Sequence, residues 1–192
     1  VIGTLIARQL SKFEGEVILI EKREDLGQGI TKANSAIIHG GYDDPPASLR
    51  GRLCARGNEL YDRLARELKV PVNRIGSIVV ARNEEELKKL EELLVNGQAN
   101  GVRDLRIVGR EELHELEPAI SSVFNYALYC GSAGITEPWM VAIAASINAA
   151  RNGAEIITGD GVVGGRVEEG SIKSLRLASG REIKNIDIVI NA

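Results

Sequence analysis

The spacing of apolar residues along this chain of 192 residues predicts helices that alternate with short strands. Apolar positions recur at intervals of three and four residues in several stretches, which is the pattern of an amphipathic helix. The predicted helices cover residues 2–12, 48–69, 84–94, 110–116 and 137–152. Short runs rich in Val and Ile predict strands over residues 17–20, 77–81, 105–108, 126–130, 154–158, 162–167, 171–177, 182–183 and 186–190. This alternation predicts an α/β protein.

The beginning of the chain has the order of a dinucleotide-binding βαβ unit that lacks its first strand. Gly3 is placed as the last glycine of a G-x-G-x-x-G motif, and the strand after the helix ends at Glu21. A carboxylate there binds a free ribose hydroxyl and repels a 2′-phosphate, which favours FAD or NAD over NADP. A charged residue that simply closes a strand is the alternative interpretation. Because the strand at 186–190 also stops without a turn, we expect a fragment cut at both ends.

Two compositional breaks, Pro71 and the loop at residues 131–134, delimit a middle segment of the chain. The predicted elements between them follow the order strand, helix, strand, helix, strand. We therefore expect an incomplete Rossmann-like domain formed by residues 1–70 and 135–192. Residues 71–134 are expected to form an inserted α+β cap, or substrate region.

Composition excludes some classes of function. The formal net charge is −3 with one Trp and two Phe, so the chain has neither the basic surface nor the stacking groups of a nucleic-acid-binding protein. Cys54 and Cys130 are too far apart to indicate a disulfide framework or a metal site, and we expect both to be packing residues. No apolar run approaches the roughly 20 residues that span a bilayer. We expect a cytoplasmic location, with attachment to a membrane surface as an alternative.

The run from Thr31 to Gly41 is the strongest candidate for a functional site. Asn34 and Ser35 are expected to cap a helical turn whose free amides face a pyrophosphate. His39 follows, and the glycines after it permit a close approach of the backbone. A lone histidine is more often a core or surface residue, but these small polar neighbours favour a functional role.

The sequence Asn-Ser-Ala-Ile-Ile-His-Gly-Gly-Tyr at residues 34–42 resembles the FAD-dependent glycerol-3-phosphate oxidase and dehydrogenase group of the D-amino-acid oxidase superfamily. L-2-hydroxyglutarate oxidases are close relatives with a similar run. The likeness continues through Arg56-Gly57-Asn58, through residues 74–77 and through residues 134–139. It therefore covers nearly the whole chain.

The resemblance implies FAD as cofactor, with Gly3 near the pyrophosphate, Glu21 on the adenosine ribose and the backbone of Val162 against the adenine. Asn191 and Ala192 resemble the start of a turn that returns to the cofactor. The implied cofactor-binding residues are Gly3, Glu21, Lys22, Thr31, Asn34, Ser35, Ala36, Val162 and Ala192. We expect the 192 residues alone to be inactive and to bind FAD weakly or not at all.

The resemblance also implies a reaction in which a substrate carbon delivers hydride to flavin N5 while a base removes the hydroxyl proton. His39 fits the base, because an imidazole can be neutral near physiological pH and accept a proton. The favoured substrate is sn-glycerol 3-phosphate, which gives dihydroxyacetone phosphate; L-2-hydroxyglutarate is the alternative. The electron acceptor stays open among oxygen, a quinone and a partner subunit.

Two hypotheses from other classes remain. A non-catalytic dinucleotide-binding or assembly subunit would keep the fold without redox chemistry, and an NAD-linked dehydrogenase is compatible with Glu21 alone. Among further candidates, Arg50, Arg52 and Arg56 could bind a phosphate or carboxylate, although their helical spacing favours solvent exposure. His114 lies among glutamates on a predicted solvated face. Trp139 fits either a substrate-lining position or the core.

Overall fold

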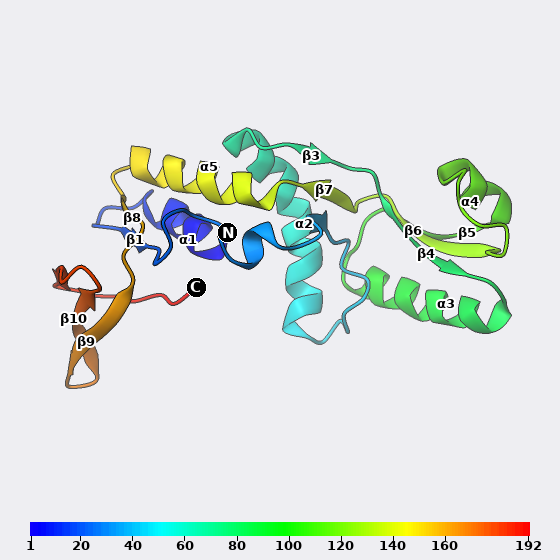
Figure 1. The fold of residues 1–192 in the computed structure, drawn as a ribbon. Helices are drawn as coiled ribbons and strands as arrows, with labels where there is room; N and C mark the ends of the chain where they lie inside the picture. The colour runs from blue at the N-terminus through cyan, green and yellow to red at the C-terminus, as the bar shows by residue number, and fades with distance from the viewer. The chain divides into compact units, whose positions relative to one another are not determined.

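The computed structural model describes residues 1–192, and the chain divides into two compact units (Figure 1). The terminal unit comprises Val1–Ser35, Leu68–Val70 and Glu137–Ala192. The central unit comprises Ala36–Glu67 and Pro71–Thr136. The predicted division at residues 70 and 135, based on the breaks at Pro71 and the loop at 131–134, stays a prediction; by contacts, residues 36–67 group with residues 71–136.

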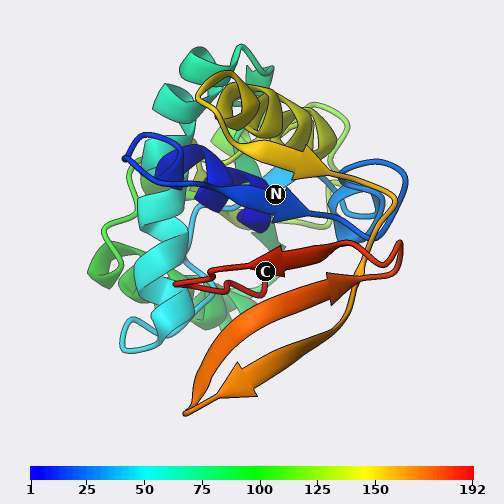
Figure 2. The same ribbon diagram turned by 90° about the vertical axis from the view of Figure 1, so that its left-hand side faces the viewer.

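The terminal unit is built on a parallel strand pair and two packed helices. Helix α1 (Ile2–Leu10) packs against α5 (Pro138–Arg151), and β1 (Ile18–Ile20) pairs in parallel with β8 (Glu155–Ile157). Figure 2 shows the two strands side by side. A small core of Ala7, Ala149 and Ala154 lies between these elements, with Val17, Leu19 and Ile156 packed against it. This arrangement confirms the predicted α/β class.

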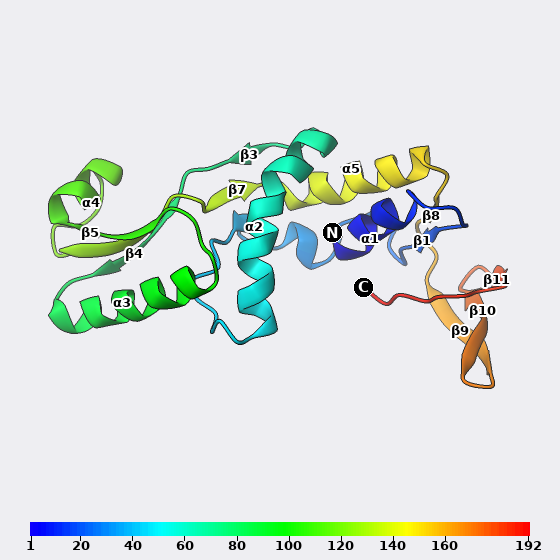
Figure 3. The same ribbon diagram turned by 180° about the vertical axis from the view of Figure 1, so that it is seen from behind.

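A second sheet of the terminal unit is antiparallel and follows β8 in the chain. Its order is β11-β10-β9, formed by β9 (Val162–Glu168), β10 (Ser171–Leu177) and β11 (Glu182–Lys184) (Figure 3). Gly180 turns the chain between the last two strands with a φ of 89°, a conformation that suits glycine. The strand predicted at 186–190 is wrong. The apolar pattern is present, but no neighbouring strand pairs with it, and Ile188 is 78% exposed.

The larger sheet of the central unit carries helices on both faces (Figure 1). Its antiparallel order is β4-β6-β5, formed by β4 (Ser77–Ala81), β5 (Leu105–Gly109) and β6 (Tyr126–Cys130). Helices α3 (Glu84–Ala99) and α4 (Arg110–Leu116) cover it. Because successive residues of a strand point to opposite faces, Leu128 packs with Leu90 of α3 while Ala127 packs with Leu113 of α4.

A smaller sheet of the central unit corrects one prediction. Its order is β2-β7-β3, formed by β2 (Ile37–Ile38), β3 (Val72–Asn73) and β7 (Gly134–Thr136), and the long helix α2 (Leu49–Leu68) lies in the same unit. The helical turn predicted after Asn34 and Ser35 is wrong, because β-branched Ile37 and Ile38 pair with β7 instead.

The start of α5 also differs from the prediction. Glu137, not Thr136, is its N-terminal cap residue, and Pro138 follows in the first turn. The Thr136 hydroxyl is engaged elsewhere, since it donates to the Pro71 carbonyl at 2.9 Å. None of the helices is both long and apolar enough to span a membrane.

Candidate active site

Glu21 lies at the carboxyl end of the parallel strand pair in the terminal unit. Its amide donates to the Ile157 carbonyl at 2.8 Å, and its own carbonyl accepts from the Asp160 amide at 3.3 Å. The carboxylate accepts a hydrogen bond from the Arg23 amide at 3.0 Å. The carboxyl ends of the strands in an open α/β sheet are where ligands bind, so Glu21 stands at the expected edge.

Lys22 and Gly161, the residue before Val162, approach closely at the same edge. A Cβ atom added to Gly161 would lie 2.8 Å from the Cβ atom of Lys22, so a larger residue would push the two segments apart. This glycine allows the start of β9 to reach the end of β1. Val162 is 48% exposed there, with its backbone next to Gly161.

Gly3, Thr31 and Ala192 gather near the first turn of α1. A Cβ atom built on Gly3 would lie 3.6 Å from the Cβ of Ala192, which is ordinary contact. The nitrogen of Val1 donates to the Thr31 hydroxyl at 3.4 Å. The first turn of α1 contains no acidic residue, and the amides of a first helical turn have no partners within the helix. Such a helix start fits the negative charge of a pyrophosphate.

The polar run continues through the 3₁₀ turn η1 (Ile30–Lys32). The Asn34 amide nitrogen donates to the carbonyls of Ile30 and Thr31, both at 2.9 Å, and so holds the end of this turn. Ser35 is exposed. Ala36, in the central unit, has a φ of 60°, a left-handed conformation that costs about 1 kcal/mol for a residue with a Cβ. Its carbonyl accepts from the Thr136 amide at 3.0 Å.

In the central unit, the side chain of His39 is exposed, whereas the backbone on either side of it is held by close contacts. Ile38 before it is 5% exposed and pairs with Gly134 of β7. A Cβ on Gly40 would lie 2.5 Å from the Cys130 sulfur. Gly41 has a φ of 104°, and a Cβ there would lie 2.8 Å from the Ala55 nitrogen. Both glycines are therefore needed where they stand.

A buried polar network adjoins this backbone. The Asn58 amide nitrogen donates to the His39 carbonyl at 2.8 Å and to the Ser132 carbonyl at 2.9 Å. Arg74 donates to the same Ser132 carbonyl at 2.6 Å and forms an ion pair with Asp62 at 2.8 Å. Asn58 and Arg74 both lie in segments that carry the family resemblance, but the sequence alone assigns a role to neither.

Two tyrosines of the central unit are half-buried, and burial raises the pKa of each. The Tyr42 hydroxyl lies 3.3 Å from that of Ser77, and this hydrogen bond opposes part of the effect of burial on the Tyr42 pKa. Burial also raises the pKa of Tyr61, and a hydrogen bond with Thr136 lowers it by part of that increase. Both phenols are therefore neutral hydrogen-bonding groups at physiological pH.

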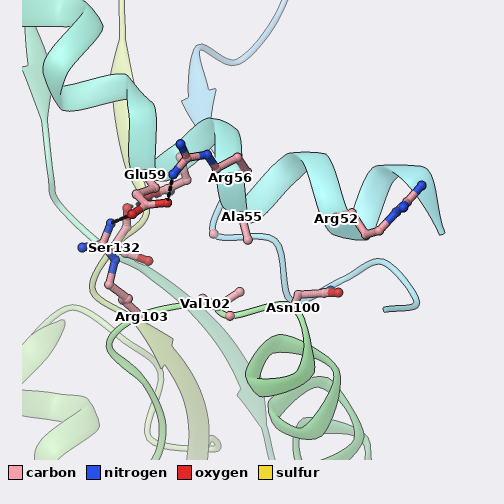
Figure 4. A pocket seen from close by; sticks show the side chains of 11 residues that line it. Arg52, Ala55, Arg56, Glu59, Asn100, Val102, Arg103 and Ser132 are labelled. Atoms are coloured by element: carbon pink, nitrogen blue, oxygen red, sulfur yellow. Dashed lines mark hydrogen bonds and ion pairs between the residues drawn. The ribbon is translucent and has the colours of Figure 1, made fainter. Parts of the chain in front are cut away.

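A cavity of ≈ 360 Å³ in the central unit is lined by Arg52 and Arg56 of the predicted arginine cluster (Figure 4). The Glu59 carboxylate forms ion pairs with Arg56 and, at 3.4 Å, with Arg103. Arg52 also lines the cavity, whereas Arg50 has an 84% exposed side chain and pairs with Asp44 at 3.4 Å. Much of the positive charge is thus compensated within the protein, as the solvent-exposed interpretation expects.

Two further candidates, His114 and Trp139, are partly accessible to solvent. His114 is partly buried in the last turn of α4, and Trp139 is 42% exposed in the first turn of α5, near Gly27. Neither residue has a side-chain hydrogen bond to a predicted site residue. Cys130 is fully buried and Cys54 partly buried, both as free thiols.

Comparison with protein families identifies the fold and its cofactor. The family described as "FAD dependent oxidoreductase" matches residues 1–192. The chain belongs to this family, and FAD is the cofactor of the family. The residues gathered at the edge of the β1–β8 pair and at the start of α1 fit an adenosine and a pyrophosphate respectively.

Relatives with known activities support this assignment. The chain is 48% identical over 163 residues to glycerol 3-phosphate dehydrogenase of Caloramator mitchellensis, covering 85% of this chain and 34% of the relative. It is 33% identical over 123 residues to mitochondrial L-2-hydroxyglutarate dehydrogenase of Arabidopsis thaliana, covering 64% and 26%. The matched part of the chain therefore spans between about a quarter and a third of the length of these curated relatives.

A solved structure shares the fold. L-α-glycerophosphate oxidase from Mycoplasma pneumoniae, with FAD bound, matches with a TM-score of 0.82 and 28% identity. The match covers 92% of this chain and 46% of the oxidase chain. The Rossmann-like FAD-binding fold predicted from the sequence is thereby confirmed.

Proposed function

We propose that the protein containing this chain oxidises sn-glycerol 3-phosphate to dihydroxyacetone phosphate. The observation that carries the proposal is the 48% identity to a glycerol 3-phosphate dehydrogenase over 85% of the chain. Identity to the L-2-hydroxyglutarate dehydrogenase is lower, at 33% over a shorter segment. The similarity to a solved glycerophosphate oxidase supports the same substrate class.

In this proposal FAD is held by Gly3, Glu21, Lys22, Thr31, Asn34, Ser35, Ala36, Val162 and Ala192. All of these residues except Ala36 belong to the terminal unit, and the proximity of Gly3 to Ala192 and of Gly161 to Lys22 supports their grouping there. Glu21 accepts hydrogen bonds from the adenosine ribose, and the first turn of α1 faces the pyrophosphate. FAD, when bound, supplies the hydride acceptor.

His39 is proposed as the base. Oxidation of a secondary alcohol to a ketone removes a hydride from carbon and a proton from oxygen, so an adjacent proton acceptor is required. The side chain of His39 is exposed, whereas its backbone is fixed by β2, by Asn58 and by the two following glycines. This combination leaves the imidazole accessible to a substrate and holds its point of attachment still.

The test is His39→Ala in the complete protein that contains this sequence. We expect turnover with glycerol 3-phosphate to fall about 10²- to 10⁴-fold, the usual contribution of a general base, with the flavin content unchanged. His114→Ala removes the other histidine of the chain and is expected to keep full turnover. Full turnover in His39→Ala would remove this residue from the mechanism.

Substrate and class are tested by flavin reduction without oxygen. Glycerol 3-phosphate is expected to bleach the flavin spectrum, whereas L-2-hydroxyglutarate is expected to leave it unchanged. Bleaching by L-2-hydroxyglutarate alone would establish the alternative substrate, and bleaching by neither would favour a non-catalytic subunit. Release of NAD instead of FAD on denaturation would contradict the assignment of FAD as cofactor.

The electron acceptor stays open among oxygen, a quinone and a partner subunit. The cytoplasmic location, with attachment to a membrane surface as the alternative, stays a prediction.

A further inference from the structure

Asn58 is a buried polar residue in the middle of a helix whose exposed positions are mostly charged. It is 8% exposed and lies seven residues after buried Gly51 and seven before buried Ala65. Residues at this spacing lie on one face of a helix. An asparagine on such a face must have hydrogen-bond partners within the protein, because an unpaired buried amide costs about 1–3 kcal/mol.

Both hydrogens of the Asn58 amide have partners far away in the sequence. One hydrogen bond goes to the carbonyl of His39, 19 residues earlier, and the other to the carbonyl of Ser132, 74 residues later. The amide group therefore joins α2 to the segment that carries His39 and to the turn between β6 and β7.

Arg74 determines which way the Asn58 amide faces. Its guanidinium donates to the Asn58 side-chain oxygen at 3.3 Å and to the Asn58 backbone carbonyl at 3.0 Å. Asp62 holds the guanidinium in turn, accepting from Nε at 3.0 Å and from the second terminal nitrogen at 2.8 Å. With its oxygen directed to a cation, the amide must present its nitrogen to the two carbonyls.

We propose that Asn58 is a positioning residue that holds His39 in place for proton removal, with Arg74 as its support. This inference rests on the proposed function, in which His39 is the base. Asn58 clamps the carbonyl of the residue that carries the imidazole, so its loss shifts the imidazole without removing it. Misplacement of a catalytic group by about 1 Å can cost about 100-fold in rate.

The primary variant is Asn58→Asp in the complete, flavin-loaded protein. Aspartate has the same shape, but it replaces the two N–H donors with an oxygen that faces two carbonyl oxygens. We expect kcat with glycerol 3-phosphate to fall about 10- to 100-fold. KM is expected to stay within about twofold, because misplacing the base affects the transition state rather than substrate binding.

Asn73→Asp is the matched control. Asn73 is exposed on β3 in the same unit, so the variant makes the same chemical change and adds the same charge. It is expected to keep wild-type kcat and KM. An equal loss in Asn73→Asp would show that added charge in this unit, rather than the clamp, lowers turnover, and would overturn the proposal.

A double-mutant cycle separates positioning from a general effect on the fold. Single-turnover flavin reduction is measured in His39→Ala, in Asn58→Asp and in the double variant. If Asn58 acts through His39, the double variant is as slow as His39→Ala and no slower. If Asn58→Asp lowers the rate by the same factor with and without His39, or has no effect in the wild-type background, the positioning role is overturned while His39 stays the base.

The cycle also keeps the two proposals apart. A His39→Ala protein with full activity overturns the proposed mechanism itself, whatever Asn58 does. If Asn58→Asp does not fold with flavin, the same cycle is run with Asn58→Ser, whose hydroxyl keeps one donor. Asn58→Ser is expected to lose less turnover than Asn58→Asp, and its effect is likewise expected to vanish when His39 is absent; persistence of the effect contradicts the proposal.

Discussion

The two units of this chain bury different kinds of side chain. In the terminal unit the fully buried face of α5 is mostly small, with Ala142, Ala145 and Ala149 beside Val141. Ala7 of α1 belongs to the same cluster as Ala149. In the central unit the helices that cover the larger sheet instead bury leucines, Leu90 of α3 and Leu113 of α4, and Leu128 is buried on β6. The core between α1 and α5 is therefore formed by small side chains, whereas the core of the central unit is filled by branched side chains.

This difference follows from what each unit has to bring together. Small residues allow helix backbones to approach one another and the parallel strands closely, and close packing of helix on strand is what the dinucleotide-binding fold requires next to the pyrophosphate. The central sheet has helices on both faces, so large side chains fill the space on each side. The two units should therefore fail under opposite substitutions: loss of volume in the central unit and gain of volume in the terminal unit.

The largest effect on stability is expected from Leu128→Ala. Leu128 is fully buried on the central strand β6, so its truncation leaves a cavity and should lower the free energy of unfolding by about 2–5 kcal/mol. Urea denaturation of the complete protein measures the loss. Leu53→Ala makes the same change at a 59% exposed position of α2 and is expected to alter stability by no more than about 0.5 kcal/mol. Similar values for both would contradict the large-residue core.

A smaller loss is expected from Ala149→Leu in the terminal unit. Ala149 is fully buried where α5 packs on α1, and added methyl groups there should cost about 1–3 kcal/mol of the free energy of unfolding. Ala150→Leu is the control, because the next residue of the same helix is exposed. Thermal unfolding of both variants is compared. An Ala149→Leu protein as stable as Ala150→Leu would show that the core around Ala149 can accept a larger side chain without loss of stability.

The smallest effect concerns the pH dependence of the terminal unit. Hydrogen bonds from the Ser179 hydroxyl and amide lower the pKa of Asp160 below its ordinary value of 3.8. Because the folded pKa is lowered, ionised Asp160 stabilises the fold above pH 3.8, and this contribution is lost as the pH falls through the folded pKa.

Ser179→Ala removes the hydroxyl donor and is expected to raise the Asp160 pKa toward 3.8, which NMR titration of the carboxyl carbon measures. Ser171→Ala, at an exposed position of β10, is expected to leave the Asp160 pKa unchanged. An unchanged Asp160 pKa in Ser179→Ala would exclude the hydroxyl as its cause. In the central unit a carboxyl pKa is lowered by a charged group instead, because hydrogen bonds from Arg82 lower the pKa of Glu86.

Much of the fold could be predicted from local pattern. The predicted bounds of β4, β6, β10 and α4 agree with the structure. Each of these segments has apolar residues at the spacing of its own type of secondary structure and is bounded by polar residues or turns. The candidate base was found in the same way. His39 stands in a run of small polar residues and glycines that local chemistry already distinguishes from a core segment.

The apolar and polar pattern is enough to give the type of each strongly periodic element, the helix–strand order that ends at Glu21 and the polar run that leads to His39. Contacts across the fold are needed to establish that Ile37 and Ile38 form a strand, that residues 186–190 do not, and that Asn58 holds the His39 carbonyl. The physical reason is the same in each case. Periodicity specifies which face a residue presents, whereas a strand or a buried amide also needs a hydrogen-bond partner, and that partner lies far away in the sequence.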